Sequence, residues 1–217
     1  MGSVIIRSLR DVNMEIERGS FTTIYGPAGS GKTKLLSILS LMEPPTSGEF
    51  YFEGRNTNEI TVRELSVTRA AKIGVVPQIL NLNMTISILE NVSVAAMIHG
   101  YDSRSAREKA AEWLHALDLG HKMNCTPLEL NQLEIKKTGL AKAVIKDPGV
   151  LLIDEPYYLL APREVREMQD ALSFVHQING ATLIQATRNM DAGKPGTVVY
   201  HIQNGKTICE GLSTTAA

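Results

Sequence analysis

A glycine-rich segment near the start of the chain has the residue types and spacing of a phosphate-binding loop. The segment reads Gly26, Pro27, Ala28, Gly29, Ser30, Gly31, Lys32, Thr33 and Lys34, and it fits the pattern GxxxxGK[ST]. Glycines let such a loop curl until successive backbone N–H groups converge on phosphate oxygens, and the N-terminus of a following helix adds its positive dipole end. We expect Lys32 to bridge the β- and γ-phosphates of a nucleoside triphosphate and Thr33 to ligate Mg²⁺. An ordinary glycine-rich turn is disfavoured because every fixed position of the pattern is present.

Two carboxylates follow the most continuous apolar run of the chain. Residues 150–153 read Val-Leu-Leu-Ile and are typical of a central parallel strand that is covered on both faces. Asp154 and Glu155 come directly after this run. A phosphate loop needs a carboxylate on a neighbouring strand to hold magnesium, so we expect Asp154 to hold the metal and Glu155 to act as general base toward water. A solvated strand end is the alternative interpretation.

The rest of the chain must position these groups, and its pattern predicts an α/β fold with a mostly parallel sheet. Strands are expected at residues 12–16, 21–25, 49–53, 72–76, 150–153 and 182–186, with a closing hairpin of residues 198–202 and 207–210. Helices are expected at residues 34–42, 86–99, 103–119, 130–145 and 162–177. Three of these helices are consecutive, which predicts a helical subdomain at about residues 79–145.

Length and charge favour one ordinary domain and disfavour nucleic acid as a partner. The chain has 217 residues, 43% hydrophobic and 21% charged, so residues 1–217 are expected to form a single domain. Lys and Arg number 22 against 23 Asp and Glu, which gives no basic footprint for nucleic acid. Cys125 and Cys209 lie outside any metal-ligand spacing, and no run of about 20 apolar residues is present, so we expect a cytoplasmic location.

Together these motifs resemble the ATP-binding cassette ATPases, the nucleotide-binding subunits of ABC transporters. The resemblance is carried by the phosphate loop and by residues 11–16, 46–49, 53–54, 76–78, 85–86, 90–92, 147–148, 151–156 and 203–206. Residues 85–120 are most similar to lipoprotein-release, macrolide-export and cell-division transporters. The resemblance implies a P-loop NTPase core with an N-terminal antiparallel β subdomain and an inserted helical subdomain.

The resemblance also implies ligands and partners. We expect ATP and Mg²⁺ as ligands, a homodimer or a heterodimer with another ABC ATPase subunit, and a separate transmembrane permease, with the chain peripheral on the inner face of the membrane. Gln78 corresponds to the glutamine that touches the magnesium and the attacking water. Residues 79–90 are then expected to face the coupling helix of the permease.

Several positions depart from the family pattern. The family signature Leu-Ser-Gly-Gly-Gln is replaced by Leu130-Asn131-Gln132-Leu133-Glu134, which lacks the bare backbone that two glycines offer to an incoming phosphate. Because the signature of one subunit meets the ATP of the other, a homodimer pairs two altered signatures. A heterodimer with a standard partner pairs this chain's ATP with an unaltered one.

Three further departures concern the rest of the site. The switch histidine is replaced by Arg188, which stays charged and can bind a phosphate but cannot shuttle protons, and we expect it to sense the γ-phosphate. Ala161 stands in place of the aspartate that reaches across the dimer. No aromatic residue precedes Phe21, so the sequence offers no candidate for the aromatic ring that stacks on adenine.

Two functions remain open from the sequence. The first is ATP hydrolysis that drives a membrane permease; the second is a hydrolysis-poor regulatory or structural subunit that dimerises on ATP. A P-loop kinase is disfavoured because no arginine-rich lid or acceptor pocket is recognisable. DNA-repair relatives of this fold are disfavoured because no sustained heptads separate Lys32 from Asp154.

Overall fold

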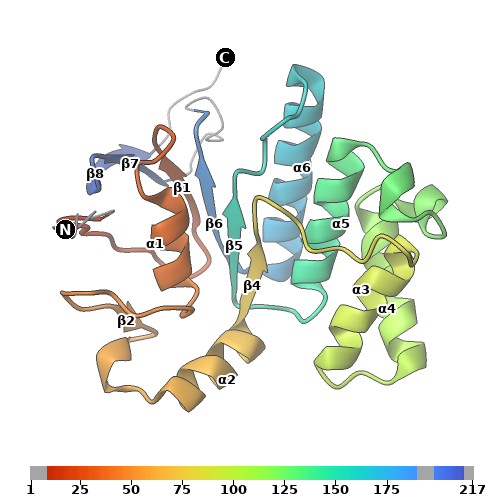
Figure 1. Cartoon of the computed structure of the whole chain (residues 1–217), viewed down its shortest axis with the longest axis horizontal. Coiled ribbons are helices and arrows are strands. Elements are labelled where there is room, and N and C mark those ends of the chain that lie inside the picture. Colours follow the sequence, from red (N-terminus) through yellow and green to blue (C-terminus); the bar gives the residue numbers. More distant parts are fainter. Residues whose placement is uncertain (1–8, 190–197, 213–217) are drawn as a thin grey trace, which may run out of the picture.

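The computed structural model describes residues 9–189 and 198–212 and is built around a six-stranded sheet (Figure 1). The strand order is β4-β5-β6-β1-β7-β8, and all neighbours pair in parallel except β7 and β8, which form an antiparallel hairpin. The strands are β1 Phe21–Tyr25, β4 Ile73–Val76, β5 Val150–Asp154, β6 Thr182–Thr187, β7 Val198–Gln203 and β8 Lys206–Leu212. The predicted mostly parallel α/β fold is confirmed.

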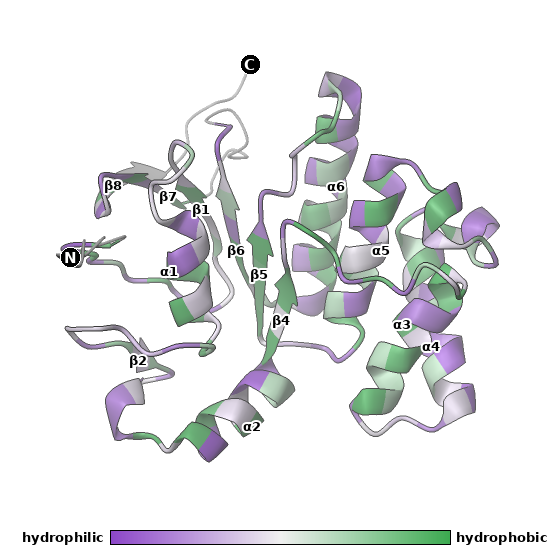
Figure 2. Ribbon diagram, viewed as in Figure 1, coloured by the Kyte–Doolittle hydropathy of each residue, from purple (hydrophilic) through white to green (hydrophobic). Residues whose placement is uncertain are grey.

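The apolar run of β5 is continuous because both faces of the sheet are covered. Successive side chains of a strand point to opposite faces. Leu151 and Ile153 accordingly belong to one buried cluster, with helices α3 to α6, whereas Leu152 belongs to a second cluster with α1. The hydrophobic colouring of β4 and β5 in Figure 2 follows from this double burial.

Six α-helices surround the sheet in the described part of the chain. They are α1 Lys32–Leu39, α2 Val62–Lys72, α3 Ile88–Ile98, α4 Ser103–Ala116, α5 Gln132–Val144 and α6 Pro162–Asn179. Helices α3, α4 and α5 pack together on one side of the molecule (Figure 1). Short 3₁₀ turns lie at Thr57–Glu59, Gly120–Lys122 and Pro127–Glu129. The expected helices are all present, with ends shifted by up to three residues.

Helix α2 was not predicted, because it buries none of its side chains and has no apolar stripe. Its sequence signal is instead a capping box. The Thr61 hydroxyl accepts a hydrogen bond from the Glu64 N–H at 3.3 Å, and the Glu64 carboxylate accepts one from the Thr61 N–H at 3.1 Å. Periodicity therefore fails for a helix that lies on the surface along its whole length.

The strand predicted at residues 12–16 is wrong, because that segment is not a strand in the structure. Its side chains do alternate between half-buried and exposed, as the pattern requires. Side-chain hydroxyls replace a backbone ladder: the Thr207 Oγ1 accepts from the Asn13 N–H at 3.0 Å, and the Tyr200 hydroxyl donates to the Glu15 carbonyl at 2.8 Å. Nearby, β2 Tyr51–Phe52 and β3 Arg55–Asn56 form a small antiparallel pair.

Candidate functional site

Four parallel strands end at one edge of the sheet and gather the predicted site. Across neighbouring strands, Tyr25 pairs with Thr187, Ala186 with Asp154, and Ile153 with Val76. The chain therefore leaves β1, β6, β5 and β4 side by side. The segments that follow these strand ends contain the glycine-rich loop, Arg188, Glu155 and Gln78. Ligands of open parallel sheets bind at this edge.

The glycine-rich loop curls from β1 into α1 through backbone conformations that favour glycine. Gly29 and Gly31 have φ of 75° and 103°, in the left-handed region. A side chain at Gly26 is excluded by packing, since a Cβ there would lie 2.3 Å from the Ile202 carbonyl oxygen. Within the part of the chain that the structure describes, the buried Ser30 hydroxyl has no hydrogen-bond partner. The loop thus has the curled shape and the spare polar atom expected of a phosphate cradle.

The two lysines of the segment lie in different surroundings. Lys32 is 5% exposed, and its ammonium donates to the carbonyl oxygens of Gly26 at 2.7 Å and Pro27 at 3.0 Å. The Lys34 ammonium pairs with Glu43 instead. Lys32 is therefore the lysine whose charge is held inside the loop, and any contribution of Lys34 to a phosphate comes from its backbone.

Thr33 and Asp154 meet from opposite sides of the site. The Thr33 hydroxyl donates to the Asp154 Oδ2 at 2.8 Å. Among the described residues, the buried Asp154 Oδ1 has no hydrogen-bond partner. Burial raises the pKa of this carboxyl above its ordinary value, against the hydrogen bond from Thr33, which lowers it. A hydroxyl beside a buried carboxylate with a spare oxygen is a ligand set that fits Mg²⁺.

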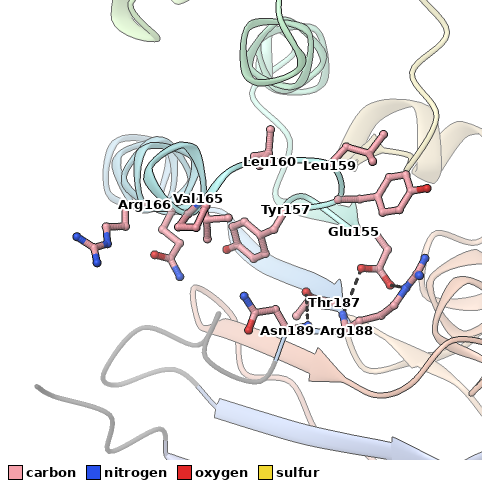
Figure 3. Close-up of a pocket in the computed structure, with 12 residues that line it drawn as sticks. Glu155, Tyr157, Leu159, Leu160, Val165, Arg166, Thr187, Arg188 and Asn189 are labelled. Atoms are coloured by element: carbon pink, nitrogen blue, oxygen red, sulfur yellow. Dashed lines mark hydrogen bonds and ion pairs between the residues drawn. The ribbon is translucent and has the colours of Figure 1, made fainter.

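Glu155 is held through both its backbone and its carboxylate. Its φ is 48°, its N–H donates to the Ala186 carbonyl at 2.8 Å, and its own carbonyl accepts from the Lys136 ammonium at 3.1 Å. The carboxylate Oε1 lies 3.0 Å from the Arg188 Nε and 3.4 Å from the Lys32 ammonium. The Oε2 accepts from the Arg188 backbone N–H at 3.2 Å (Figure 3). The predicted general base is thus surrounded by cations.

The sequence did not single out Lys136, which is 7% exposed on α5. Burial lowers the pKa of Lys136, while the negative charges of Glu155 and Asp154 raise it. Its position in the sequence resembles any polar residue of an amphipathic helix, so only the packing of α5 against the end of β5 shows its role. Lys136 holds the backbone of Glu155 from the side of the helices.

The residues after Glu155 form a loop that touches the switch position. The Arg188 guanidinium lies 5.4 Å from the centre of the Tyr158 ring. Tyr157 is buried, and its hydroxyl donates to the Gln185 Oε1 at 2.6 Å; the Gln185 amide in turn donates to the Thr23 hydroxyl at 2.9 Å. This chain of hydrogen bonds links the loop to β1, the strand that leads into the glycine-rich loop.

Gln78 lies at the same edge of the sheet but does not hydrogen-bond to Thr33 or Asp154. It lies two residues past β4 and is half-buried. In the described ranges, no hydrogen bond joins its side chain to Thr33 or Asp154. Of the predicted site residues, the structure thus brings Lys32, Thr33, Asp154, Glu155 and Arg188 into one contact group, and places Gln78 beside that group.

The segment at the signature position begins α5. Asn131 is the N-cap residue: its Oδ1 accepts from the Glu134 N–H at 2.9 Å, and the Glu134 carboxylate accepts from the Asn131 N–H at 2.9 Å. Leu133 is 6% exposed and packs in the core, whereas Gln132 is exposed. Only one of the two side chains that replace glycines therefore projects outward.

No helix of the described residues is long and apolar enough to cross a membrane.

Comparisons with known proteins agree with this geometry. A family model described as ABC transporter matches residues 9–158. An uncharacterised ABC transporter ATP-binding protein of Thermotoga maritima is 32% identical over 206 residues, 95% of this chain and 88% of the relative. The lipoprotein-releasing system ATP-binding protein LolD of Syntrophus aciditrophicus is 36% identical over 184 residues, 85% of this chain and 82% of the relative.

Two further matches extend the comparison. The macrolide export ATP-binding/permease protein MacB of Hyphomonas neptunium is 31% identical over 216 residues, all of this chain but 33% of MacB. The solved dimer of the cassette MJ0796 of Methanocaldococcus jannaschii, bound to ADP and Pi, superposes with a TM-score of 0.86 at 29% identity, covering 99% of this chain and 95% of that one. The chain therefore belongs to the ABC transporter family and is one of its ATP-binding subunits.

Proposed function

We propose that this chain binds Mg-ATP at the carboxyl edge of its sheet and hydrolyses it to ADP and phosphate to drive a separate membrane permease. The glycine-rich loop, from Gly26 to Lys34, holds the phosphates through its backbone N–H groups. Lys32 leaves the loop carbonyls for the β- and γ-phosphates. Thr33, Asp154 and Gln78 hold the magnesium ion, Glu155 orients the attacking water, and Arg188 senses the γ-phosphate.

The observation that carries this proposal is the Thr33–Asp154 pair with its spare carboxylate oxygen. A buried carboxylate oxygen without a partner is costly unless a cation or a donor meets it. Magnesium at this position supplies charge neutralisation for the phosphates. The pair lies directly beside Lys32, so metal and phosphate meet at one place.

The hydrolytic step depends on how Glu155 is held. Its backbone is fixed by Ala186 and Lys136, so the carboxylate leaves the end of β5 in one direction. A general base held in this way accepts the proton of water as the water attacks the γ-phosphate in line. Lys32 and Arg188, which now contact the carboxylate, are the groups that the phosphates attract.

A groove between the sheet and the helices offers a surface on which a permease could dock. A hollow of about 330 Å³ lies among β4, α3 and α5; its lining includes the apolar Pro77, Leu80 and Ile98 and the basic Lys142 and Lys146. Ile79 at its edge is 86% exposed. We place the permease contact here, at the segment that follows Gln78, with the chain on the cytoplasmic face of the membrane. MacB supports this pairing, since the name of that protein combines an ATP-binding part with a permease and this chain matches a third of it.

A second candidate is a hydrolysis-poor subunit that binds ATP in order to dimerise. Two observations favour it: both carboxylate oxygens of Glu155 are engaged by Arg188, and the exposed Gln132 stands where the family has glycine. In both candidates the chain pairs with a second ABC ATPase subunit, as the MJ0796 cassette does.

Calorimetric titration of ATP tests the metal site. In the wild type, EDTA is expected to weaken ATP binding, because Asp154 needs the metal to meet the phosphates. Asp154→Asn is expected to show the weak affinity in both conditions. Asp147→Asn, which changes an exposed partner of Lys109, is the matched control and keeps the wild-type response. Equal ATP affinity in wild type and Asp154→Asn contradicts the proposal. Phosphate release measured on the same samples separates the two candidates.

A further inference from the structure

We propose that Arg188 and Tyr158 form a clamp that restrains Glu155 until a γ-phosphate draws the guanidinium away. The inference rests on the proposed function, in which Glu155 is the general base. It assigns a positioning role to Tyr158, and it gives Arg188 two alternating partners, the carboxylate at rest and the γ-phosphate in the loaded site.

The first step is the occupancy of the carboxylate. Arg188 uses two donors on Glu155: its Nε on Oε1 at 3.0 Å and its backbone N–H on Oε2 at 3.2 Å. Lys32 approaches Oε1 at 3.4 Å. Glu155 is 6% exposed, so the carboxylate end of these contacts is shielded from water. A carboxylate that accepts on both oxygens from cationic residues is not free to take a proton from an attacking water.

The second step is the support of the guanidinium. Tyr158 lies three residues after Glu155 in the same loop, and the Arg188 guanidinium is 5.4 Å from its ring centre. A cation near an aromatic face is attracted by the ring quadrupole, and arginine stacks on such faces well. The guanidinium thus has a carboxylate on one side and an aromatic ring on another. The ring holds Arg188 in the orientation in which Nε meets Glu155.

The third step is the freedom of the clamp to open. The Arg188 side chain is 44% exposed and borders a hollow of about 610 Å³, which Tyr158, Gln169 and Asn189 also line (Figure 3). Arg188 directly follows β6, and this strand lies between β5 and β1. The exposed guanidinium therefore has open space beside it, and Arg188 follows the strand that neighbours the one leading into the phosphate loop.

The clamp distinguishes ATP from ADP. A guanidinium binds a phosphate through two parallel hydrogen bonds, so a γ-phosphate competes with Glu155 for it. Lys32 leaves Glu155 for the β-phosphate of either nucleotide, whereas only ATP presents a group to Arg188. The Oε1 of Glu155 is released when both cations move, which happens with ATP and is reversed once phosphate leaves, while the Arg188 backbone N–H stays on Oε2 and keeps the carboxylate oriented.

Nitrogen-15 NMR of the Arg188 side chain tests the clamp directly. In the nucleotide-free chain its Nε–H signal, assigned with Arg188→Lys, is expected to exchange slowly with water. Mg-ADP is expected to leave the signal in place, and the slowly hydrolysed analogue Mg-AMPPNP to shift it. The same signal in all three states overturns the proposal, as does fast exchange in the nucleotide-free chain.

Two variants of the ring separate positioning from stability. Tyr158→Ala is expected to speed the exchange of the Arg188 Nε–H and to raise kcat about two- to five-fold, with little change in KM. Tyr158→Phe keeps the ring and is expected to behave as wild type. A lower kcat in Tyr158→Ala, or equal behaviour of the two variants, overturns the proposal. If no nucleotide binds, the proposed function fails, while the exchange rate in the nucleotide-free chain still judges the clamp.

Discussion

Two segments of the chain correspond to the two phosphate-binding surfaces of the family, and they differ in how far their own residues occupy them. At the sheet edge, the exposed Thr33 of the glycine-rich loop donates to the buried Asp154, and among the described residues the second oxygen of that carboxylate has no hydrogen-bond partner. At the N-terminus of α5, Asn131 and Glu134 hydrogen-bond to each other's backbone N–H groups. The first surface thus keeps an unpartnered acceptor oxygen, whereas at the second surface side chains of the same segment already occupy two backbone N–H groups.

The difference indicates that the chain is better built to hold its own nucleotide than to complete the site of a partner. In the family, the phosphate of one subunit approaches the signature of the other through bare glycine backbone. Here the exposed Gln132 carries a side chain at that position, whereas Leu133 turns inward and packs in the core. The obstacle to a partner's phosphate is therefore one side chain rather than two.

The largest effect is expected at the sheet edge, from Glu155→Gln. Loss of a positioned general base lowers turnover about 10²- to 10⁴-fold, and phosphate release measures it. ATP affinity is expected to stay within a few-fold of wild type, because Glu155 holds no phosphate. If Glu155→Gln keeps the wild-type turnover, Glu155 is not the general base, and the sheet edge differs from the second surface in binding alone.

A smaller effect, on binding, is expected from Lys32→Ala. Loss of one charge-assisted hydrogen bond to phosphate weakens ATP binding about 10- to 100-fold, and calorimetry measures it. Lys72→Ala is the matched control, because Lys72 is an exposed lysine that pairs with Glu53 and is not part of the glycine-rich loop. Equal losses in both variants would show a general effect of charge rather than a site.

The second surface is opened by Gln132→Gly. In a Glu155→Gln background, where ATP is expected to persist, the ATP-dependent homodimer is expected to tighten about 2- to 10-fold, the worth of one backbone hydrogen bond to the partner's phosphate. Sedimentation measures the dimer. Gln132→Ala keeps a Cβ and is expected to gain less; if alanine does as well as glycine, bare backbone is not what limits this surface.

Much of the fold was predictable because strand and helix periods are strong where an element is half-buried or fully buried. The run at residues 150–153 predicted β5 because both faces of that strand are covered, and the register of β5 with β6 then placed Asp154 at the sheet edge. The sequence does not predict helix α2 because none of its side chains is fully buried, and it predicts a strand at residues 12–16 because alternation reports burial and not backbone pairing.

The contacts inside the site were less predictable, because they depend on pairs far apart in the sequence. The motif predicted Thr33 and Asp154 as metal ligands, and in the structure the Thr33 Oγ1 lies 2.8 Å from the Asp154 Oδ2. Nothing local indicates that Lys136 reaches the carbonyl of Glu155, since that contact needs α5 to pack against the end of β5. The cations around Glu155 likewise come from three separate segments.

The smallest effect concerns the cap that closes the second surface. Asn131→Ala removes the side chain that accepts from the Glu134 N–H, and loss of such a cap costs about 1 kcal/mol, which lowers Tm by about 2–4 °C in a domain of this size. Asn131→Asp keeps an acceptor oxygen and is expected to hold the wild-type Tm. Thermal unfolding by circular dichroism measures both. If Asn131→Ala leaves Tm unchanged, the cap does not stabilise α5, and the difference between this surface and the sheet edge then depends on Gln132 alone.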